Sequence, residues 1–376
     1  MTQLSSLYLH VPFCQHLCNY CDFYKRKLEV GSNQFEEFHQ FLKSSWQRHA
    51  TLMKEHQFTW SPMETIYLGG GTPSLWGKMG SEFFAEHILS HFTLRPELEF
   101  TMEVDPGAWT PELIDSWKSI GMNRISIGTQ TLNPTFLTIM DRAHSKEESL
   151  SLLKFCQENN WNYSLDFLLG LPFSKEKVRD IRTELDELLS YRPRHVSLYI
   201  LNARSKYPHT QNMPDDEFIR EEYLLVSSYL QERGFHHYEV SNFALPGFES
   251  QHNIKYWKSE SVAALGPTGT GLFKKNSHEA IRYKWKVSAP EVEIENLGFE
   301  ELNLEKTYLE LRTSEGWRPE NLTQKMKDLF NRWEEQKYGQ FQDQTMRLNS
   351  LGFLMLDSLM DDLFRLEVAR LVIKPL

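Results

Sequence analysis

Cysteine is scarce in this chain of 376 residues. There are four cysteines, and three of them, Cys14, Cys18 and Cys21, lie within a stretch of eight residues. A secreted domain held together by disulfides is small and has cysteines spread along its length, so this class of protein is not expected. Three thiols gathered in a large protein indicate metal ligands instead. Cys156 lies in an apolar segment with helical spacing, and we interpret it as a small core residue.

The chain also lacks an excess of positive charge and a long apolar run. Its 41 Lys and Arg residues are outnumbered by 51 Asp and Glu residues, and the net charge of −10 argues against general nucleic-acid binding. No apolar run approaches the ~20 residues that span a bilayer. The first six residues lack the basic region of a signal peptide. We therefore expect a cytoplasmic protein with no transmembrane segment and no nucleic-acid partner.

What the chain does contain is a regular alternation of β and α patterns. Six short apolar runs are separated by segments with helical periodicity. The runs cover residues 7–11, 65–68, 99–104, 124–128, 164–169 and 196–201. Alternating βα units with right-handed crossovers form a parallel sheet, so we predict an α/β fold with a partial barrel of six units. A closed barrel needs eight units, and an open doubly wound sheet is the alternative. In both folds functional side chains gather at the C-terminal ends of the strands.

The pattern changes after residue 205, and this change predicts the domain organisation. Residues 1–205 are expected to form the partial barrel. Residues 206–290 are expected to form a connecting region, with an amphipathic helix over 217–232 and a loop-rich stretch over 234–270. Residues 291–376 have mostly helical patterns with few strand signals, which predicts a smaller, mainly helical C-terminal domain.

The spacing Cys14-x3-Cys18-x2-Cys21 follows the first predicted strand directly. Three thiolates on one short loop can hold three irons of a [4Fe–4S] cubane, whereas closed clusters use four cysteines. One iron would then be free to bind a small molecule. The alternative is a zinc site, which normally needs four protein ligands. His16 is a candidate for the fourth ligand, although its position inside the loop is geometrically awkward.

The cysteine loop, Tyr20 and the later segment Gly69-Gly70-Gly71-Thr72-Pro73 together resemble the radical S-adenosylmethionine (SAM) superfamily. Within this superfamily, four segments resemble the HemN and HemW family of oxygen-independent coproporphyrinogen III dehydrogenases and haem chaperones. These segments are residues 8–14, 69–74, 165–172 and 252–257. The resemblance implies a partial (β/α)6 radical SAM barrel, a [4Fe–4S] cluster held by the three cysteines, and SAM bound to the open iron.

The same resemblance implies which residues contact SAM. They are Tyr8, Tyr20, Gly70, Gly71, Thr72, Glu103, Gln130, Arg142 and Asp166. Some of these residues also have a physical reason to do so. Consecutive glycines let the backbone approach a ligand closely, and a guanidinium such as that of Arg142 can bond a carboxylate bidentately. Asp166 lies in an otherwise apolar predicted strand, where a carboxylate needs a partner. Ligand contact and a structural hydrogen bond are the two explanations for it.

The segment His252-Asn253-x-x-Tyr256-Trp257 resembles a motif implicated in haem binding in HemW-like proteins. Histidine and tyrosine both serve as axial ligands of haem, and an indole can stack on a porphyrin face. The resemblance therefore implies a haem site at His252 and Tyr256, without deciding which of the two would touch iron. Taken without the resemblance, the segment is a polar loop with packed aromatic residues.

Two features separate the dehydrogenase and chaperone alternatives. The dehydrogenases that resemble this chain have a further cysteine shortly after the third, where this chain has Asp22 and Phe23, and a long extension before the cluster, which is missing here. We therefore expect a haem chaperone that binds a [4Fe–4S] cluster, SAM and haem. Its expected partners are an electron donor and the recipient haemoproteins. Dehydrogenase activity is not expected, and a radical SAM oxidoreductase acting on coproporphyrinogen III is the alternative.

Overall fold

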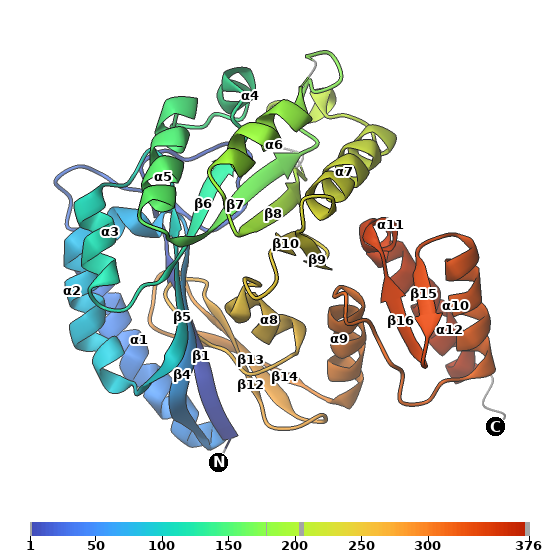
Figure 1. Cartoon of the computed structure of the whole chain (residues 1–376). Helices are drawn as coiled ribbons and strands as arrows, with labels where there is room; N and C mark the ends of the chain where they lie inside the picture. The colour runs from blue at the N-terminus through green and yellow to red at the C-terminus, as the bar shows by residue number, and fades with distance from the viewer. Residues whose placement is uncertain (1, 178, 203–206, 373–376) are drawn as a thin grey trace.

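The computed structural model describes residues 2–177, 179–202 and 207–372, and at its centre is one large curved sheet (Figure 1). Six parallel strands of this sheet are neighbours in chain order. They are β1 (Thr2–Val11), β4 (Phe58–Gly70), β5 (Leu94–Val104), β6 (Arg124–Gln130), β7 (Asn162–Leu169) and β8 (His195–Ile200). Each strand coincides with one of the six predicted apolar runs, so the predicted partial barrel is confirmed.

Helices follow the strands and cover the outer face of the sheet (Figure 1). They are α1 (Gln34–His56), α2 (Gly77–His87), α3 (Pro111–Lys118), α4 (Pro134–Ile139), α5 (Lys146–Glu158), α6 (Ile181–Ser190) and α7 (Asp216–Gln231). Several begin at a capping side chain: Thr110, Ser145, Asp180 and Asp215 each accept a hydrogen bond from a backbone N–H of the first turn. Such caps satisfy donors that the helix itself leaves free.

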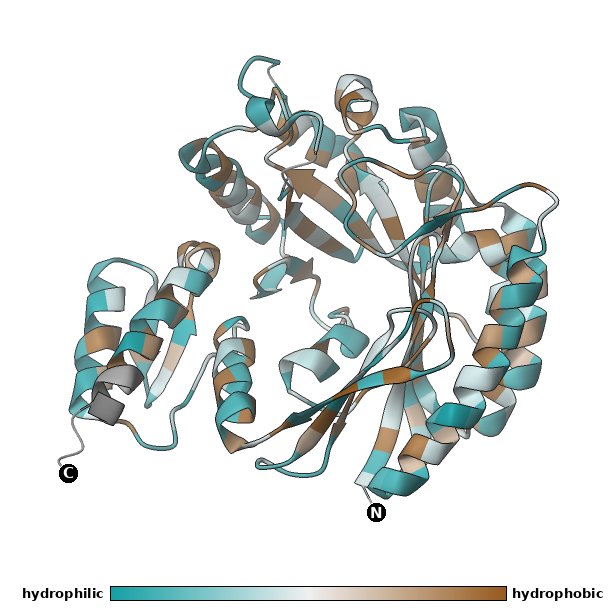
Figure 2. Ribbon diagram, turned by 180° about the vertical axis from the view of Figure 1, so that it is seen from behind, coloured by the Kyte–Doolittle hydropathy of each residue, from teal (hydrophilic) through white to brown (hydrophobic). Residues whose placement is uncertain are grey.

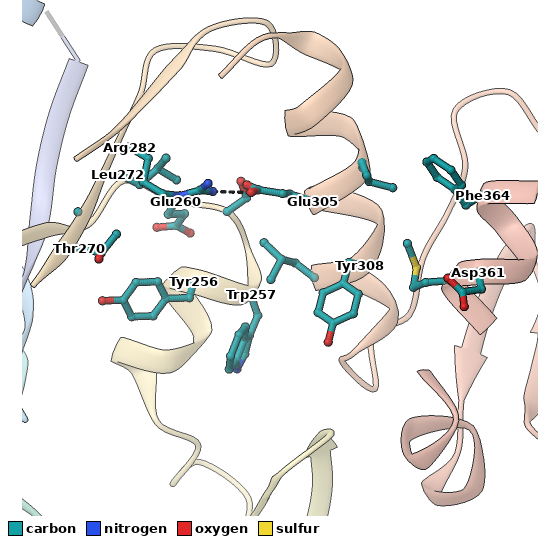
Figure 3. A pocket seen from close by; sticks show the side chains of 15 residues that line it. Tyr256, Trp257, Glu260, Thr270, Leu272, Arg282, Glu305, Tyr308, Asp361 and Phe364 are labelled. Carbon is teal, nitrogen blue, oxygen red and sulfur yellow. Dashed lines mark hydrogen bonds and ion pairs between the residues drawn. The ribbon is translucent and has the colours of Figure 1, made fainter. Parts of the chain in front are cut away.

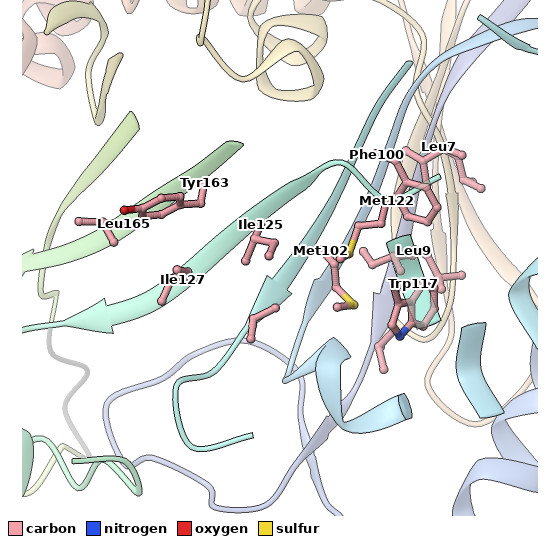
Figure 4. Packing of buried hydrophobic residues seen from close by; sticks show 14 of the residues in the cluster. Leu7, Leu9, Phe100, Met102, Trp117, Met122, Ile125, Ile127, Tyr163 and Leu165 are labelled. Carbon is pink, nitrogen blue, oxygen red and sulfur yellow. The ribbon is translucent and has the colours of Figure 1, made fainter. Parts of the chain in front are cut away.

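The main hydrophobic core lies between the sheet and these helices. Leu9 of β1, Met102 of β5 and Trp117 of α3 are fully buried there (Figure 4). Successive side chains of a strand point to opposite faces. Tyr8 and Glu103, the neighbours of these core residues in sequence, therefore point away from the helices and into the barrel interior. This alternation separates an apolar core from a polar interior.

Three short strands extend the six-stranded unit at its two edges. β11 (Ala263–Leu265) pairs parallel with β1, and β10 (Asn242–Ala244) pairs antiparallel with β8 and with β9 (His236–Glu239). Helix α8 (Gln251–Trp257) lies between β10 and β11 in the chain. The stretch 234–270 was predicted to be rich in loops, and the structure differs here. All of these elements are too short for a periodic signal, and the three strands exist through pairing at the sheet edges.

The C-terminal part contains a small sheet followed by helices (Figure 1). The sheet consists of β12 (Thr270–Lys274), β13 (Ala280–Trp285) and β14 (Val292–Leu297). After it come α9 (Phe299–Leu311), α10 (Gln324–Glu335), the hairpin β15 (Gly339–Gln342) and β16 (Thr345–Leu348), α11 (Ser350–Leu354) and α12 (Leu356–Val372). The predicted mainly helical C-terminal region is confirmed.

This C-terminal region has a hydrophobic cluster of its own, which includes Leu311, Phe330, Trp333, Met346 and Phe353. In Figure 2 brown residues recur along the strands of the central sheet among white and teal ones, and the helices carry much teal, as expected for amphipathic helices with one face in water. No helix in the described part of the chain combines the length and the apolar content needed to cross a membrane.

Candidate functional site

The three clustered cysteines lie on a loop that two short strands close at its base. β2 (Phe13–Cys14) pairs parallel with β3 (Arg26–Lys27). The backbone N–H of Arg26 donates to the carbonyl of Pro12 at 2.6 Å, and that of Leu28 donates to the carbonyl of Cys14 at 2.8 Å. The ends of the loop are thereby fixed beside the C-terminal end of β1. This is the end of a parallel sheet at which functional residues were expected.

Cys14, Cys18 and Cys21 all line one cavity of about 280 Å³. Gly71, just after β4, forms part of its wall. A Cβ atom on Gly71 would lie 2.6 Å from the carbonyl oxygen of Phe13 and 3.0 Å from Sγ of Cys14, so any side chain here would press against the cysteine loop. Thr72 reinforces the contact, because its hydroxyl donates to Sγ of Cys14 at 3.6 Å. The glycine motif therefore packs directly against the first cysteine.

Positive charges surround the cysteine loop. The Lys25 ammonium donates to the carbonyl of Cys18 at 3.1 Å and also to that of Cys21. The Arg142 guanidinium lies 3.8 Å from Sγ of Cys18. Burial raises the pKa of the Cys14 and Cys18 thiols, and Thr72 and Arg142 respectively oppose this shift. Metal binding displaces the thiol protons, and nearby positive charge favours the resulting thiolates.

Arg142 is held by several acceptors at once. Its guanidinium donates to Oδ2 of Asp105 at 2.5 Å, to the carbonyl of Gly128 at 3.1 Å and to the hydroxyl of Tyr20 at 3.2 Å. Burial opposes ionisation of Asp105, but the hydrogen bond from His144 and the charge of Arg142 lower its pKa to about 2. The Nε atom of Arg142 is buried without a hydrogen-bond partner. A donor of this charged group is therefore left for a ligand.

A second cavity, of about 390 Å³, adjoins the cysteine cavity. Both are lined by Tyr20, Cys21, Gly71, Thr72, Asp105 and Arg142. The second cavity also has Glu103 and Asp166 in its wall. Oε2 of Glu103 accepts from the backbone N–H of Gly70 at 3.0 Å, and Oε1 accepts from the hydroxyl of Tyr67 at 3.0 Å.

The two carboxylates of this cavity repel each other in a poorly solvated place. Burial and the charge of Asp166 raise the pKa of Glu103 to about 7, and burial raises the pKa of Asp166 to about 6. Asp166 also accepts from the hydroxyl of Ser126, at 3.5 Å. A ligand with a positive charge would relieve the repulsion. The adjoining cavities thus combine thiols for iron with carboxylates for a cationic small molecule.

Eight of the nine predicted SAM residues lie in the walls of these two cavities. They are Tyr20, Gly70, Gly71, Thr72, Glu103, Gln130, Arg142 and Asp166. Tyr8 lies outside the lining, with its ring stacked on Tyr67 at 6.2 Å and its hydroxyl 3.1 Å from Nδ1 of His10. Whether SAM contacts Tyr8 stays a prediction.

Sequence reasoning missed four residues at this site. Lys25, Tyr67, His144 and Tyr199 support or line it. Tyr67 and Tyr199 lie in predicted apolar strands. The hydroxyl of each tyrosine, a polar group in an otherwise apolar run, was the signal that could have identified them. Nothing local distinguishes Lys25 or His144 from surface residues, because their roles depend on partners brought close by the fold.

His252 lies away from these cavities, at the start of α8. Its side chain is 1% exposed, and its Nδ1 atom is 2.8 Å from the hydroxyl of Thr65. Glu99 accepts from the backbone N–H groups of Gln251 and His252 at 3.0 and 2.9 Å. The ring of His252 stacks on Tyr67 at 5.2 Å. Burial lowers the pKa of His252 to about 3, so the imidazole is neutral.

The other end of α8 reaches a third cavity, of about 750 Å³ (Figure 3). Its walls include Tyr256 and Trp257 of α8, Leu272 of β12, Leu304 and Tyr308 of α9, and Met360 of α12. We call it the α8–α12 cavity. The two predicted haem residues are neighbours, with ring centroids 5.4 Å apart: Tyr256 lies in the wall of this cavity, whereas His252 is not among the lining residues and stacks on Tyr67.

Comparisons with known proteins identify the family. The family model of the radical SAM superfamily matches residues 8–185. The heme chaperone HemW of Lactococcus lactis subsp. lactis is 32% identical over 289 residues, which cover 74% of this chain and 71% of that protein. The chain belongs to the HemW family of the radical SAM superfamily. The heme chaperone HemW of Bacillus subtilis is also similar, at 31% identity over 279 residues and 71% of each protein.

The fold of this HemW-family chain also matches a solved structure. The coproporphyrinogen III oxidase HemN of Escherichia coli, a radical SAM enzyme, superposes with a TM-score of 0.76 at 14% identity. The match covers 96% of this chain and 89% of that one. At such low identity the likeness shows a shared fold, and it confirms the predicted radical SAM fold.

Membership of the radical SAM superfamily implies a [4Fe–4S] cluster and SAM, and the cysteine cavity fits this expectation. Three thiols share one cavity, and a glycine leaves room beside the first of them. A cubane takes one thiolate on each of three irons, and the three thiols of this loop supply that number.

Proposed function

We propose that this HemW-family chain is a cytoplasmic haem chaperone that binds a [4Fe–4S] cluster, SAM and haem and delivers haem to recipient haemoproteins. The observation that carries the proposal is the cysteine cavity adjoining the carboxylate cavity. A cluster held by Cys14, Cys18 and Cys21 has one iron without a protein thiolate, and the neighbouring cavity has groups suited to SAM. The names of the similar HemW proteins support haem as the cargo.

Glu103 and Arg142 have separate roles in this proposal. Glu103, whose carboxylate is already oriented by Gly70 and Tyr67, accepts hydrogen bonds from the cationic amino group of SAM. Arg142 orients the carboxylate of SAM through its free Nε donor, while Asp105 holds the rest of its guanidinium in place. The cluster, when bound and reduced by an external electron donor, supplies the electron for chemistry at the SAM sulfonium.

Haem transfer is the experiment that tests the function. Anaerobically reconstituted protein is loaded with haem and mixed with an apo-haemoprotein, and the Soret band of the recipient is followed. We expect transfer, together with about four irons and four sulfides per chain.

The fold shared with HemN makes coproporphyrinogen III dehydrogenase the rival function. The same preparation is therefore incubated with coproporphyrinogen III and SAM. Formation of protoporphyrinogen IX with matching SAM cleavage would replace the chaperone proposal by the rival. Cluster formation with neither haem transfer nor porphyrinogen turnover would contradict both functions while leaving the cofactor site intact.

A further inference from the structure

Lys25 is a further residue of the cysteine cavity, and it belongs to none of the sequence motifs. Its side chain lines this cavity together with the three thiols. Its ammonium donates to the carbonyl of Cys18 at 3.1 Å and also to the carbonyl of Cys21. One side chain therefore bonds the backbone of two of the three expected iron ligands.

These two bonds hold the middle of a loop whose ends are fixed elsewhere. The pairing of β2 with β3 closes the base of the loop. Among the described residues, the only backbone hydrogen bond inside the segment from Cys14 to Cys21 runs from the N–H of Cys21 to the carbonyl of Cys18, at 3.4 Å. So few internal bonds leave the separation of two thiols poorly defined. The ammonium of Lys25 draws both carbonyls to one point and thereby limits that separation.

The direction of the Lys25 side chain is set by these carbonyls. An ammonium is strongly hydrated, so a lysine on a polar loop normally extends into water. The next two residues, Arg26 and Lys27, follow this rule and are exposed, whereas Lys25 is half-buried. Three consecutive basic residues thus behave differently, and the difference is the pair of backbone acceptors that only Lys25 reaches.

The charge of Lys25 also differs from the other basic groups of the cavity wall. The guanidinium of Arg142 pairs with Asp105 at 2.5 Å, and the imidazole of His16 contacts Asp141 at 2.9 Å. Lys25 forms no ion pair with any residue in the described part of the chain, and its hydrogen bonds go to neutral carbonyl oxygens. Its positive charge is therefore not offset by a partner.

The one further carboxylate of this wall is engaged away from Lys25. Glu148 lies in the first turn of α5, and its carboxylate accepts from the backbone N–H of Ser145 at 2.7 Å. A carboxylate at this position is stabilised by the N-terminus of the helix. The cavity wall thus keeps one cation whose field acts on the thiols without a neutralising neighbour.

A positive charge at this place has two effects on a cluster bound by the three thiols. It favours the thiolates that iron requires. It also favours the reduced state, because one-electron reduction makes a cluster more negative, and opposite charges attract most strongly where water is scarce. Groups that orient metal ligands from outside contribute strongly to metal affinity in this way.

We propose that Lys25 is a positioning residue of the cluster site, which fixes Cys18 and Cys21 through their carbonyls and raises the reduction potential of the bound cluster through its charge. This assignment rests on the proposed function for the presence of the cluster. It adds a side chain that controls how readily the external electron donor can reduce that cluster.

The charge is tested by redox titration of full-length protein, reconstituted anaerobically and without SAM, with the reduced cluster followed by electron paramagnetic resonance. Lys25→Gln keeps an amide donor but removes the charge, and we expect its midpoint potential to shift to a more negative value. Lys25→Arg keeps the charge and should remain near the wild-type potential. Lys27→Gln removes an equal charge from an exposed neighbour and is the matched control, with no shift expected.

The positioning role is tested by removal of iron with a chelator. Lys25→Met can bond neither carbonyl, and we expect it to lose its iron at a chelator concentration roughly 10-fold lower than Lys27→Met, its matched control. Circular dichroism melting curves show whether all variants are folded.

The results separate this assignment from the proposed function. If wild-type protein forms no cluster, the cofactor part of the proposed function fails, and the role of Lys25 fails with it. If the cluster forms but Lys25→Gln titrates like wild-type protein, or Lys27→Gln shifts as much, the effect on the potential is overturned. Equal iron loss from Lys25→Met and Lys27→Met overturns the positioning role. Haem transfer by wild-type protein tests the chaperone function independently of these variants.

Discussion

The adjoining cysteine and carboxylate cavities differ from the α8–α12 cavity in chemistry and in origin. The first two are lined by thiols, carboxylates and a buried arginine, contributed by strand ends within the first 202 residues. The α8–α12 cavity is mainly apolar and is built from residues 256–364, which come from helices and strands that meet only in the folded chain. A polar site can therefore be specified by short motifs at strand ends, whereas an apolar cavity depends on packing between distant elements.

The largest expected effect concerns the cysteine cavity. Replacing Cys18 by alanine removes one of three thiolates, and we expect iron and sulfide to fall from about four each per chain to nearly zero. Cys156→Ala is the control, because Cys156 is fully buried in the core and remote from the loop. Both proteins are analysed for iron and sulfide after anaerobic reconstitution. Equal losses in the two variants would remove the cysteine loop as the cluster site.

The next effect concerns the charge of Glu103. Its pKa of about 7 means that it loses its proton as the pH rises from 6 to 8. A cationic amino group binds the ionised carboxylate, so SAM affinity of the wild-type protein should increase over this range. Glu103→Gln should bind SAM about 10-fold more weakly at pH 8, without this pH dependence. Isothermal titration at three pH values measures both.

Glu112→Gln is the matched control for Glu103, because Glu112 is exposed at the start of α3. We expect it to behave like the wild-type protein. A pH dependence that persists in Glu103→Gln would show that another group, such as Asp166, titrates in the SAM site.

A smaller expected effect tests whether His252 is a buried structural residue or part of the haem site. Its pKa of about 3 lies below the ordinary value of 6.5 for histidine. Between these values the unfolded chain binds a proton that the native protein does not, so His252 makes the native protein less stable as the pH falls from 6.5 towards 3. His252→Gln should remove part of this slope. It should also cost about 1–3 kcal/mol at pH 7, because Thr65 loses a buried partner.

Thermal or denaturant unfolding at pH 5 and pH 7 measures the stability of His252→Gln, with the exposed His278→Gln as control. The Soret maximum of the haem complex is recorded in parallel and should not move. A displaced maximum would make His252 an iron ligand and would join the barrel interior to the haem site.

The smallest expected effect tests which of two tyrosines, Tyr67 and Tyr8, contributes to the SAM site. Tyr67→Phe removes the hydroxyl that donates to Glu103 at 3.0 Å, and we expect SAM affinity to fall by roughly 2- to 10-fold, the equivalent of about 0.5–1.5 kcal/mol. Tyr8→Phe is the comparison variant, since its hydroxyl is bonded to His10 outside the cavity lining. A larger loss in Tyr8→Phe would establish the SAM contact that the family resemblance implies for Tyr8.

The six parallel strands and the cluster loop could be predicted from the sequence because each has a local signal. The apolar runs recur with a βα rhythm, and Cys14, Cys18 and Cys21 lie on one loop. Sequence reasoning missed β9, β10 and β11, which have three or four residues each and exist through pairing with a sheet edge. The division of the chain at residues 205 and 290 stays a prediction.

By itself, then, the sequence determined the α/β class, the radical SAM motifs and eight residues that line the adjoining cavities. Only the tertiary structure decided that Arg142 is held by Asp105, that His252 is buried against Tyr67, and that Trp257 meets α9 and α12 across a cavity. The physical reason is the range of the interactions. The residues of a ligand motif are close together in the sequence, whereas ion pairs, ring stacking and apolar cavities form between residues that only folding brings together.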